Sequence, residues 1–116
     1  MPDKSILIVE DEFLVGLYIQ STLKDAGFAV TAPAVSVKEA LHHIAEEGFD
    51  AAVLDINLGE ETSEEIAVKL SDLKIPFVFV TGYEHVNLSP QFAGSPLLEK
   101  PIEGNQLVDT IHSLCS

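Results

Sequence analysis

Arginine is absent from this sequence of 116 residues, and only six lysines stand against 19 aspartates and glutamates, so the formal net charge is −13. Proteins that bind nucleic acid need a basic patch to neutralise phosphates, and anionic membrane surfaces attract basic segments for the same reason. Six scattered lysines form no such patch. We therefore expect neither nucleic acid nor a membrane surface among the partners of this protein.

Cysteine and long apolar runs are also scarce. Cys115 is the only cysteine, which excludes an intrachain disulfide and a cysteine-rich zinc site. No apolar run approaches the roughly 20 residues of a membrane-spanning helix, and the first residues lack the features of a signal peptide. With 47 % hydrophobic residues, the chain is too apolar for a disordered acidic tail. These features predict one folded domain over residues 1–116, located in the cytoplasm.

Short apolar runs alternate along the chain with segments of helical periodicity. The predicted strands are residues 6–9, 28–32, 51–54, 77–80 and 97–98. The predicted helices are residues 12–26, 36–47, 62–73 and 104–114. Continuous apolar runs are typical of strands buried on both faces of a parallel sheet. Their alternation with helices indicates an α/β fold, a doubly wound five-stranded parallel sheet with helices on both faces.

Local signals refine the predicted helices. Ser36 and Glu39 have the spacing of a capping box, and Thr62 and Glu65 have the spacing of a second one. The apolar residues of the helix at 12–26 fall on one stripe, formed by Phe13, Leu14, Leu17, Tyr18 and Leu23.

The helical pattern weakens at residues 83–96. Ser89-Pro90 and Gly94-Ser95-Pro96 interrupt this segment, and proline and glycine are strong breakers of regular structure. We therefore expect a weak fourth helix that is short or mobile.

Charged and hydroxyl side chains stand at the ends of four predicted strands, and they are Glu10, Asp11, Asp55, Thr81 and Lys100. Functional groups collect at the carboxyl ends of strands in doubly wound sheets. Carboxylates at short range raise one another's pKa unless a cation lies between them, and Mg²⁺ suits a site with few carboxylates and several waters. Such a site can accept a phosphoryl group on a carboxylate, with Lys100 and Thr81 holding the phosphoryl oxygens.

Each of these residues alone has an ordinary structural explanation. An acidic pair after a strand often caps the next helix, and an aspartate at a strand end is often a turn residue. Their combination, in order, at four strand ends is what favours the phosphoacceptor site.

The chain resembles the response-regulator receiver domains of two-component signalling over essentially its whole length. The resemblance rests on residues 6–11 (ILIVED), 53–58 (VLDINL), 79–82 (FVTG) and 99–101 (EKP). It implies the flavodoxin-like strand order 2-1-3-4-5 and a cis peptide bond between Lys100 and Pro101. Receivers of this kind catalyse only their own phosphorylation and dephosphorylation, so the resemblance does not imply an enzyme.

The resemblance also implies roles for the acidic residues. Asp55 would be the phosphoacceptor and a metal ligand, and Asp11 would bind Mg²⁺ directly. Glu10 would assist through water, and Asn57 would offer its backbone carbonyl to the metal.

The same resemblance implies which residues would change conformation when the site is phosphorylated. Thr81 and Lys100 match the family's switch hydroxyl and phosphate-binding lysine. Many receivers carry a Tyr or Phe at the position of Leu97, so Tyr83 either takes the place of this aromatic residue or is an ordinary loop residue. An order–disorder change of residues 83–96 is a further hypothesis for the switch.

A narrower resemblance concerns residues 76–83 (PFVFVTGY) and 55–63 (DINLGEETS). Both are similar to the FATGUY subgroup of receivers, with Val80 where that name has alanine. Its members are mostly alphaproteobacterial single-domain regulators or receivers of stress-response regulators, and they often work with histidine kinases of the HWE or a related type. This implies a stand-alone receiver that is phosphorylated by a histidine kinase or phosphotransfer protein and signals through protein–protein contact or a phosphorelay.

Three alternatives stay open on the sequence. The first is a receiver cut from a larger regulator with a DNA-binding or anti-anti-sigma output. A phosphatase of the haloacid-dehalogenase type also uses an aspartate nucleophile, but it needs a second aspartate where Asn57 stands. A flavodoxin-type FMN binder needs a phosphate-binding loop after the first strand, where Glu10, Asp11 and Glu12 would repel the phosphate.

Overall fold

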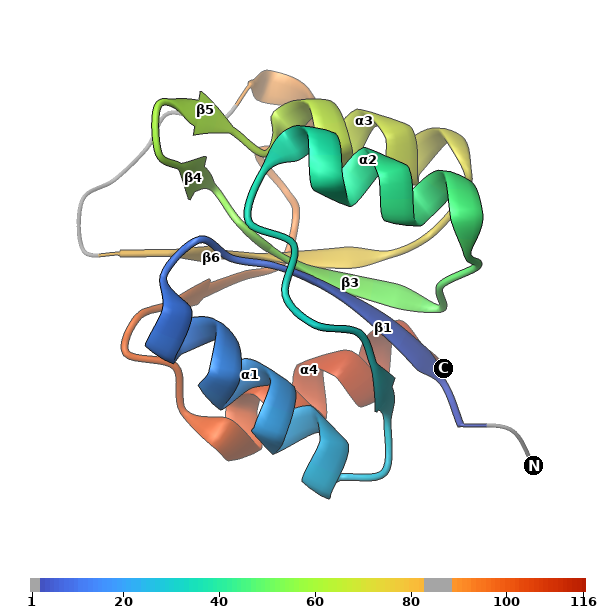
Figure 1. Ribbon diagram of the computed structural model, residues 1–116, viewed down its shortest axis with the longest axis vertical. Helices are drawn as coiled ribbons and strands as arrows, with labels where there is room; N and C mark the ends of the chain where they lie inside the picture. The colour runs from blue at the N-terminus through green and yellow to red at the C-terminus, as the bar shows by residue number, and fades with distance from the viewer. Residues whose placement is uncertain (1–2, 83–88) are drawn as a thin grey trace.

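The computed structural model describes residues 3–82 and 89–116. Its centre is a five-stranded sheet in which every pair of neighbouring strands is parallel (Figure 1). The strands are β1 (Ser5–Val9), β2 (Ala29–Val30), β3 (Ala51–Asp55), β6 (Phe77–Thr81) and β7 (Leu97–Glu99). Their order across the sheet is β2-β1-β3-β6-β7. This order is the predicted 2-1-3-4-5, and the predicted doubly wound fold is confirmed.

Helices cover both faces of the sheet (Figure 1). One face carries α1 (Phe13–Asp25) and α4 (Gly104–Leu114), and the other carries α2 (Val37–Glu46) and α3 (Glu64–Asp72). Among the helices of residues 3–82 and 89–116, none has the length and apolar character that crossing a membrane requires.

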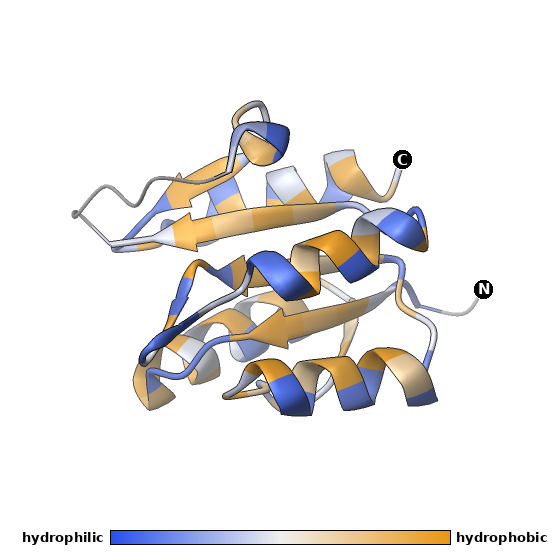
Figure 2. Cartoon of the chain, turned by 90° about the horizontal axis from the view of Figure 1, so that it is seen from above, coloured by the Kyte–Doolittle hydropathy of each residue, from blue (hydrophilic) through white to orange (hydrophobic). Residues whose placement is uncertain are grey.

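The sheet separates two apolar cores, because successive side chains of a strand point to opposite faces. Leu54 of β3 packs with the residues of α2 and α3, whereas the preceding Val53 packs with those of α1 and α4. Figure 2 shows the strands as apolar along their length, while the helices alternate between polar and apolar residues. By the same alternation, Asp55 lies on the face of the sheet that α1 and α4 cover.

Ser36 caps α2 as the first of the two predicted capping boxes requires. The Ser36 hydroxyl accepts a hydrogen bond from the Glu39 N–H at 3.1 Å, at the start of α2. The second prediction is wrong, because α3 begins at Glu64 and its N-cap residue, Ser63, makes no side-chain capping bond within the described residues. Thr62 is instead the last residue of a short strand.

That strand belongs to a hairpin that follows the predicted strand at residues 51–54, where no strand or helix is predicted before residue 62. β4 (Asn57–Leu58) pairs antiparallel with β5 (Glu61–Thr62), and Gly59 begins the two-residue turn with a φ of +64°. Glycine adopts positive φ without a steric penalty, and two-residue hairpin turns require it. The hairpin lies directly after Asp55, so it forms one side of the strand-end region.

The apolar stripe predicted for α1 is largely not the face that packs on the sheet. Of its five residues only Leu23 is buried, while Phe13 and Leu14 are 74 % and 77 % exposed. The buried face of α1 is formed by Gly16, Ile19 and Leu23, which recur at helical spacing on another side of the helix. The helix is apolar on two sides, so its periodicity alone did not identify the packed one.

Residues 89–96 carry a short 3₁₀ helix, η1 (Pro90–Phe92). The Phe92 ring is buried and packs edge-on against Phe77 and Phe79, with ring centroids 6.1 and 5.8 Å apart. The rest of the segment for which a weak helix is predicted, including Tyr83, lies outside the described residues. The hypothesis that Tyr83 is a switch residue therefore stays a prediction.

Candidate functional site

The carboxyl ends of the parallel strands bring the predicted site residues to one edge of the sheet. A pocket of about 400 Å³ opens there, lined by Asp11, Glu12, Asp55, Asn57, Gly59, Gly82 and Lys100. Thr81 is buried at the end of β6, directly before Gly82, and its carbonyl oxygen accepts a hydrogen bond from the Lys100 backbone N–H at 2.7 Å. The side chains at the strand ends therefore meet at one edge of the sheet, as the sequence indicated.

Three carboxylates crowd together at this edge. One oxygen from each of Glu10, Asp11 and Asp55 lies within 4.8 Å of the other two, and Glu10 and Asp55 are only 1 % and 5 % exposed. Burial, and then the neighbouring Asp55 carboxyl, raise the pKa of Glu10 to about 8.

This carboxylate cluster fits a hard divalent cation. The buried Oε1 atom of Glu10 already lies 3.1 Å from the Lys100 ammonium nitrogen, and a divalent cation with oxygen ligands would add positive charge that offsets the repulsion among the three acids.

Lys100 supplies the positive charge among the described residues that line the pocket. Its ammonium nitrogen lies 2.7 Å from Glu12 Oε1, 3.1 Å from Glu10 Oε1 and 3.3 Å from Asp55 Oδ2. Burial lowers the pKa of Lys100, but the hydrogen bond to Glu12 and the charges of Glu10 and Asp55 raise it by more, so the pKa lies above its usual range. Lys100 therefore stays charged beside Asp55.

The β4–β5 hairpin fixes the orientation of Asp11. The Gly59 N–H donates a hydrogen bond of 2.9 Å to Asp11 Oδ2, although the two residues are 48 positions apart in the sequence. Hydrogen bonds of this kind orient carboxylates that bind metals. The positive φ of Gly59 and its N–H thus shape the turn and the acidic cluster together.

A family model described as the response regulator receiver domain matches residues 6–112. This chain belongs to that family. The solution structure of SdrG from Sphingomonas melonis Fr1 resembles this receiver with a TM-score of 0.87 and 33 % identity, over 100 % of both chains.

Two curated relatives also match this receiver. The sensory transduction protein LytR of Staphylococcus haemolyticus is 33 % identical over 81 residues, which are 67 % of this chain and 32 % of LytR. The transcriptional regulatory protein CrdR of Helicobacter pylori is 26 % identical over 110 residues, which are 90 % of this chain and 51 % of CrdR. The receiver therefore spans about a third of the length of LytR and about half of the length of CrdR.

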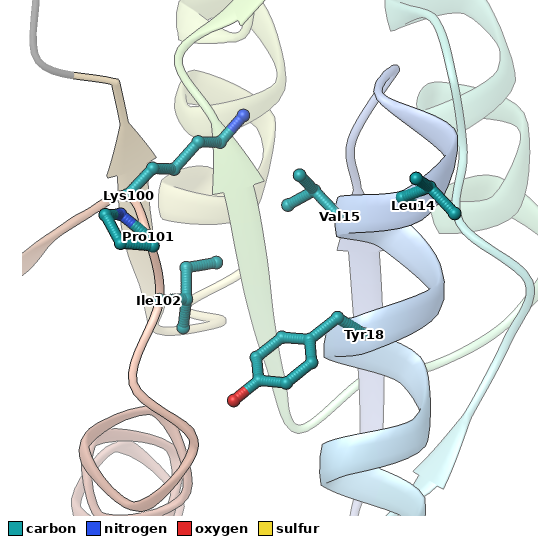
Figure 3. A pocket seen from close by; sticks show the side chains of 6 residues that line it. All are labelled: Leu14, Val15, Tyr18, Lys100, Pro101 and Ile102. Carbon is teal, nitrogen blue, oxygen red and sulfur yellow. The ribbon is translucent and has the colours of Figure 1, made fainter.

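A second, apolar pocket of this receiver adjoins the acidic one. It measures about 380 Å³ and is lined by Leu14, Val15, Tyr18, Lys100, Pro101 and Ile102. Figure 3 shows side chains of α1 on one side of it and the segment from Lys100 to Ile102 on the other. The Lys100–Pro101 peptide bond is cis, as the resemblance implied. Because Lys100 lines both pockets, the two lie on either side of this residue.

Three residues that line the receiver's pocket, Glu12, Gly59 and Gly82, were not predicted as site residues from the sequence. Gly59 had a recognisable signal, since a glycine between Leu58 and two glutamates suits a tight turn, but its bond to Asp11 depends on tertiary structure. Glu12 had no signal for its ion pair, because its partner lies 88 positions away.

The raised pKa of Glu10 predicts a pH dependence of stability for this receiver. Between about pH 4.5 and pH 8 the folded protein holds a proton on Glu10 that the unfolded chain has lost, so the free energy of unfolding should fall as the pH rises through this window. Denaturant unfolding without divalent cations measures this slope. A Glu10→Gln variant should have a flatter profile, and a slope equal to that of the wild type would contradict the prediction.

Proposed function

We propose that this receiver takes a phosphoryl group from a phosphohistidine onto Asp55, with Mg²⁺ held by Glu10, Asp11, Asp55 and Asn57. The observation that carries the proposal is the nearly buried Asp55 carboxylate at the edge of an open pocket, 3.3 Å from the Lys100 ammonium. An oxygen of Asp55 attacks the phosphorus atom, and the phosphorus–nitrogen bond of the donor breaks, leaving its electron pair on the imidazole. When bound, Mg²⁺ supplies positive charge for the crowded carboxylates and the incoming phosphoryl oxygens.

Lys100 and Thr81 then bind the newly added phosphoryl group. Phosphorylation adds a charge of about −1.5 to −2 and strong acceptor oxygens, and Lys100 and the Thr81 hydroxyl are placed at the ends of β7 and β6 to bind them. Movement of these two strand ends changes the surface that a partner meets. The output we propose is phosphorylation-dependent protein–protein contact or onward phosphoryl transfer.

The donor we propose is a histidine kinase or a histidine phosphotransfer protein. The FATGUY-like residues 76–83 and 55–63 support a kinase of the HWE type and a stand-alone receiver. The proposed function is tested with a small donor such as acetyl phosphate, since it needs no cognate kinase. One phosphoryl group should appear on the protein with Mg²⁺ and none in excess chelator. Steady hydrolysis of a phosphomonoester would instead favour a phosphatase.

A second candidate is a receiver that forms part of a larger regulator. The observation that favours it is the length of LytR and CrdR, of which this chain spans 32 % and 51 %. The reading frame of the native gene after codon 116 distinguishes the two: a stop codon there supports the stand-alone receiver, and a further coding segment supports the larger regulator.

Replacing Gly59 should weaken metal binding. In Gly59→Ala the side chain disfavours the φ of +64°, which shifts the N–H that orients Asp11, and such supporting bonds are worth roughly tenfold in metal affinity. Amide NMR titration with Mg²⁺ measures the change. Gly27→Ala is the matched control, because Gly27 also has a positive φ, +96°, but follows α1 away from the pocket. Equal Mg²⁺ affinity in the two variants would contradict the role of Gly59.

The apolar pocket beside Lys100 should contact the protein that donates the phosphoryl group. Leu14 is 77 % exposed, so Leu14→Ala should change the stability of the fold little. Removing an apolar anchor from an interface, in contrast, weakens binding roughly tenfold. We expect slower transfer from a histidine kinase that labels the wild type, with unchanged labelling by acetyl phosphate. Val68→Ala on α3, 40 % exposed, is the control. Equal rates of transfer from the kinase would contradict this docking site.

A further inference from the structure

All three N–H donors of the Lys100 ammonium group are already used in hydrogen bonds in the unphosphorylated receiver. A lysine ammonium has three N–H donors and no acceptor, and Lys100 Nζ is hydrogen-bonded to three carboxylates, those of Glu12, Glu10 and Asp55. A phosphoryl oxygen on Asp55 therefore needs one of these bonds to be released.

Glu12 is the partner that can leave at the lowest cost. Its side chain is 62 % exposed, whereas that of Glu10 is fully buried and that of Asp55 is 6 % exposed. A carboxylate that swings into water is solvated again, but one that stays buried without its cation is not. Glu12 nevertheless makes the shortest of the three contacts, at 2.7 Å.

The position of Glu12 on α1 supports a specific role for this contact. Glu12 is the N-cap residue of α1, yet its side chain makes no capping hydrogen bond among the described residues. Its carboxylate is instead directed to Lys100, at the end of β7. The residue thus links the start of α1 to the lysine at the far side of the pocket.

We propose that Glu12 is an internal competitor of the phosphoryl group for Lys100. This inference rests on the proposed function of Asp55 and Lys100. In the unphosphorylated receiver Glu12 holds one Lys100 donor, and in the phosphorylated receiver that donor passes to a phosphoryl oxygen while Glu12 turns to solvent. Glu12 is a positioning residue, since it acts through Lys100 and sets how readily the phosphorylated state forms.

The test uses beryllofluoride, an analogue of the phosphoryl group, at saturating Mg²⁺. Glu12→Gln should bind it more tightly than the wild type, by about twofold to fivefold, because the ion pair that Glu12 forms with Lys100 in the wild type is partly exposed. Amide NMR gives the affinity. The Lys100 ammonium resonance of the variant, recorded without beryllofluoride, should also shift away from that of the wild type.

Two matched variants separate the effect of this ion pair from that of overall charge. Glu60→Gln removes the same charge from the exposed hairpin turn next to Gly59, and it should leave both measurements unchanged. Glu12→Asp keeps the charge but shortens its reach, and it should resemble Glu12→Gln. An unchanged affinity in Glu12→Gln, or an equal gain in Glu60→Gln, would overturn the inference. Failure of the wild type to bind beryllofluoride would instead overturn the proposed function.

Discussion

An Asp55→Asn variant of this receiver should take up no phosphoryl group from acetyl phosphate in the presence of Mg²⁺. The amide has no ionised oxygen to attack phosphorus, and no other carboxylate in the pocket has the same surroundings. Asp11 is exposed and its carboxylate accepts a hydrogen bond from Gly59, while Glu10 is buried and has a pKa of about 8. Mass spectrometry of the intact protein measures the uptake.

The loss of labelling should not come from unfolding. Asp55 helps to raise the pKa of Glu10, so removing its charge relieves repulsion among the three acids, and the variant should unfold at a denaturant concentration no lower than that of the wild type. Asp25→Asn, which removes an exposed carboxylate at the end of α1, is the control and should label normally. Persistent labelling of Asp55→Asn would rule out Asp55 as the acceptor.

A Lys100→Ala variant should still be phosphorylated but should lose the conformational response. Asp55 and the proposed metal ligands remain, so the chemical step is retained. The phosphoryl oxygens lose the Lys100 ammonium group, however, so the bond that would couple them to the end of β7 is absent. Amide spectra with and without beryllofluoride should differ little for residues 81–82 and 97–99. A response equal to that of the wild type would contradict the role of Lys100.

The same substitution should destabilise the receiver when no divalent cation is present. Lys100 offsets the charge of the almost fully buried Asp55 and hydrogen-bonds to the buried Glu10, and leaving a buried charge without a cation is costly. We expect a loss of about 2 kcal/mol in the free energy of unfolding, which Mg²⁺ should partly restore. Lys69→Ala, on the exposed face of α3, is the control and should show neither effect.

Much of the fold was predictable because each core strand is a continuous apolar run. Residues 6–9, 51–54 and 77–80 correspond to β1, β3 and β6, and parallel strands place their carboxyl ends together by geometry alone. The meeting of Glu10, Asp11, Asp55 and Lys100 therefore followed from their places in the sequence.

Other features depend on tertiary contacts that leave little local signal. Thr62 and Glu65 satisfy the spacing of a capping box, but Thr62 pairs with Asn57 in the hairpin, and strand pairing determines its backbone instead. Leu14 and Leu17 match helical periodicity as well as Ile19 and Leu23 do, and only the approach of the sheet selects the buried set. Glu12 meets Lys100 only after β7 is in place.

Chemical trapping of the phosphorylated residue tests the central claim most directly. Borohydride reduces an aspartyl phosphate to homoserine, so the acceptor keeps a permanent mark that peptide mass spectrometry locates. After treatment with acetyl phosphate and Mg²⁺, homoserine should be found at position 55 and should be absent when the metal is chelated. Homoserine at another aspartate, or an unmodified Asp55 in protein that carries phosphate, would contradict the account.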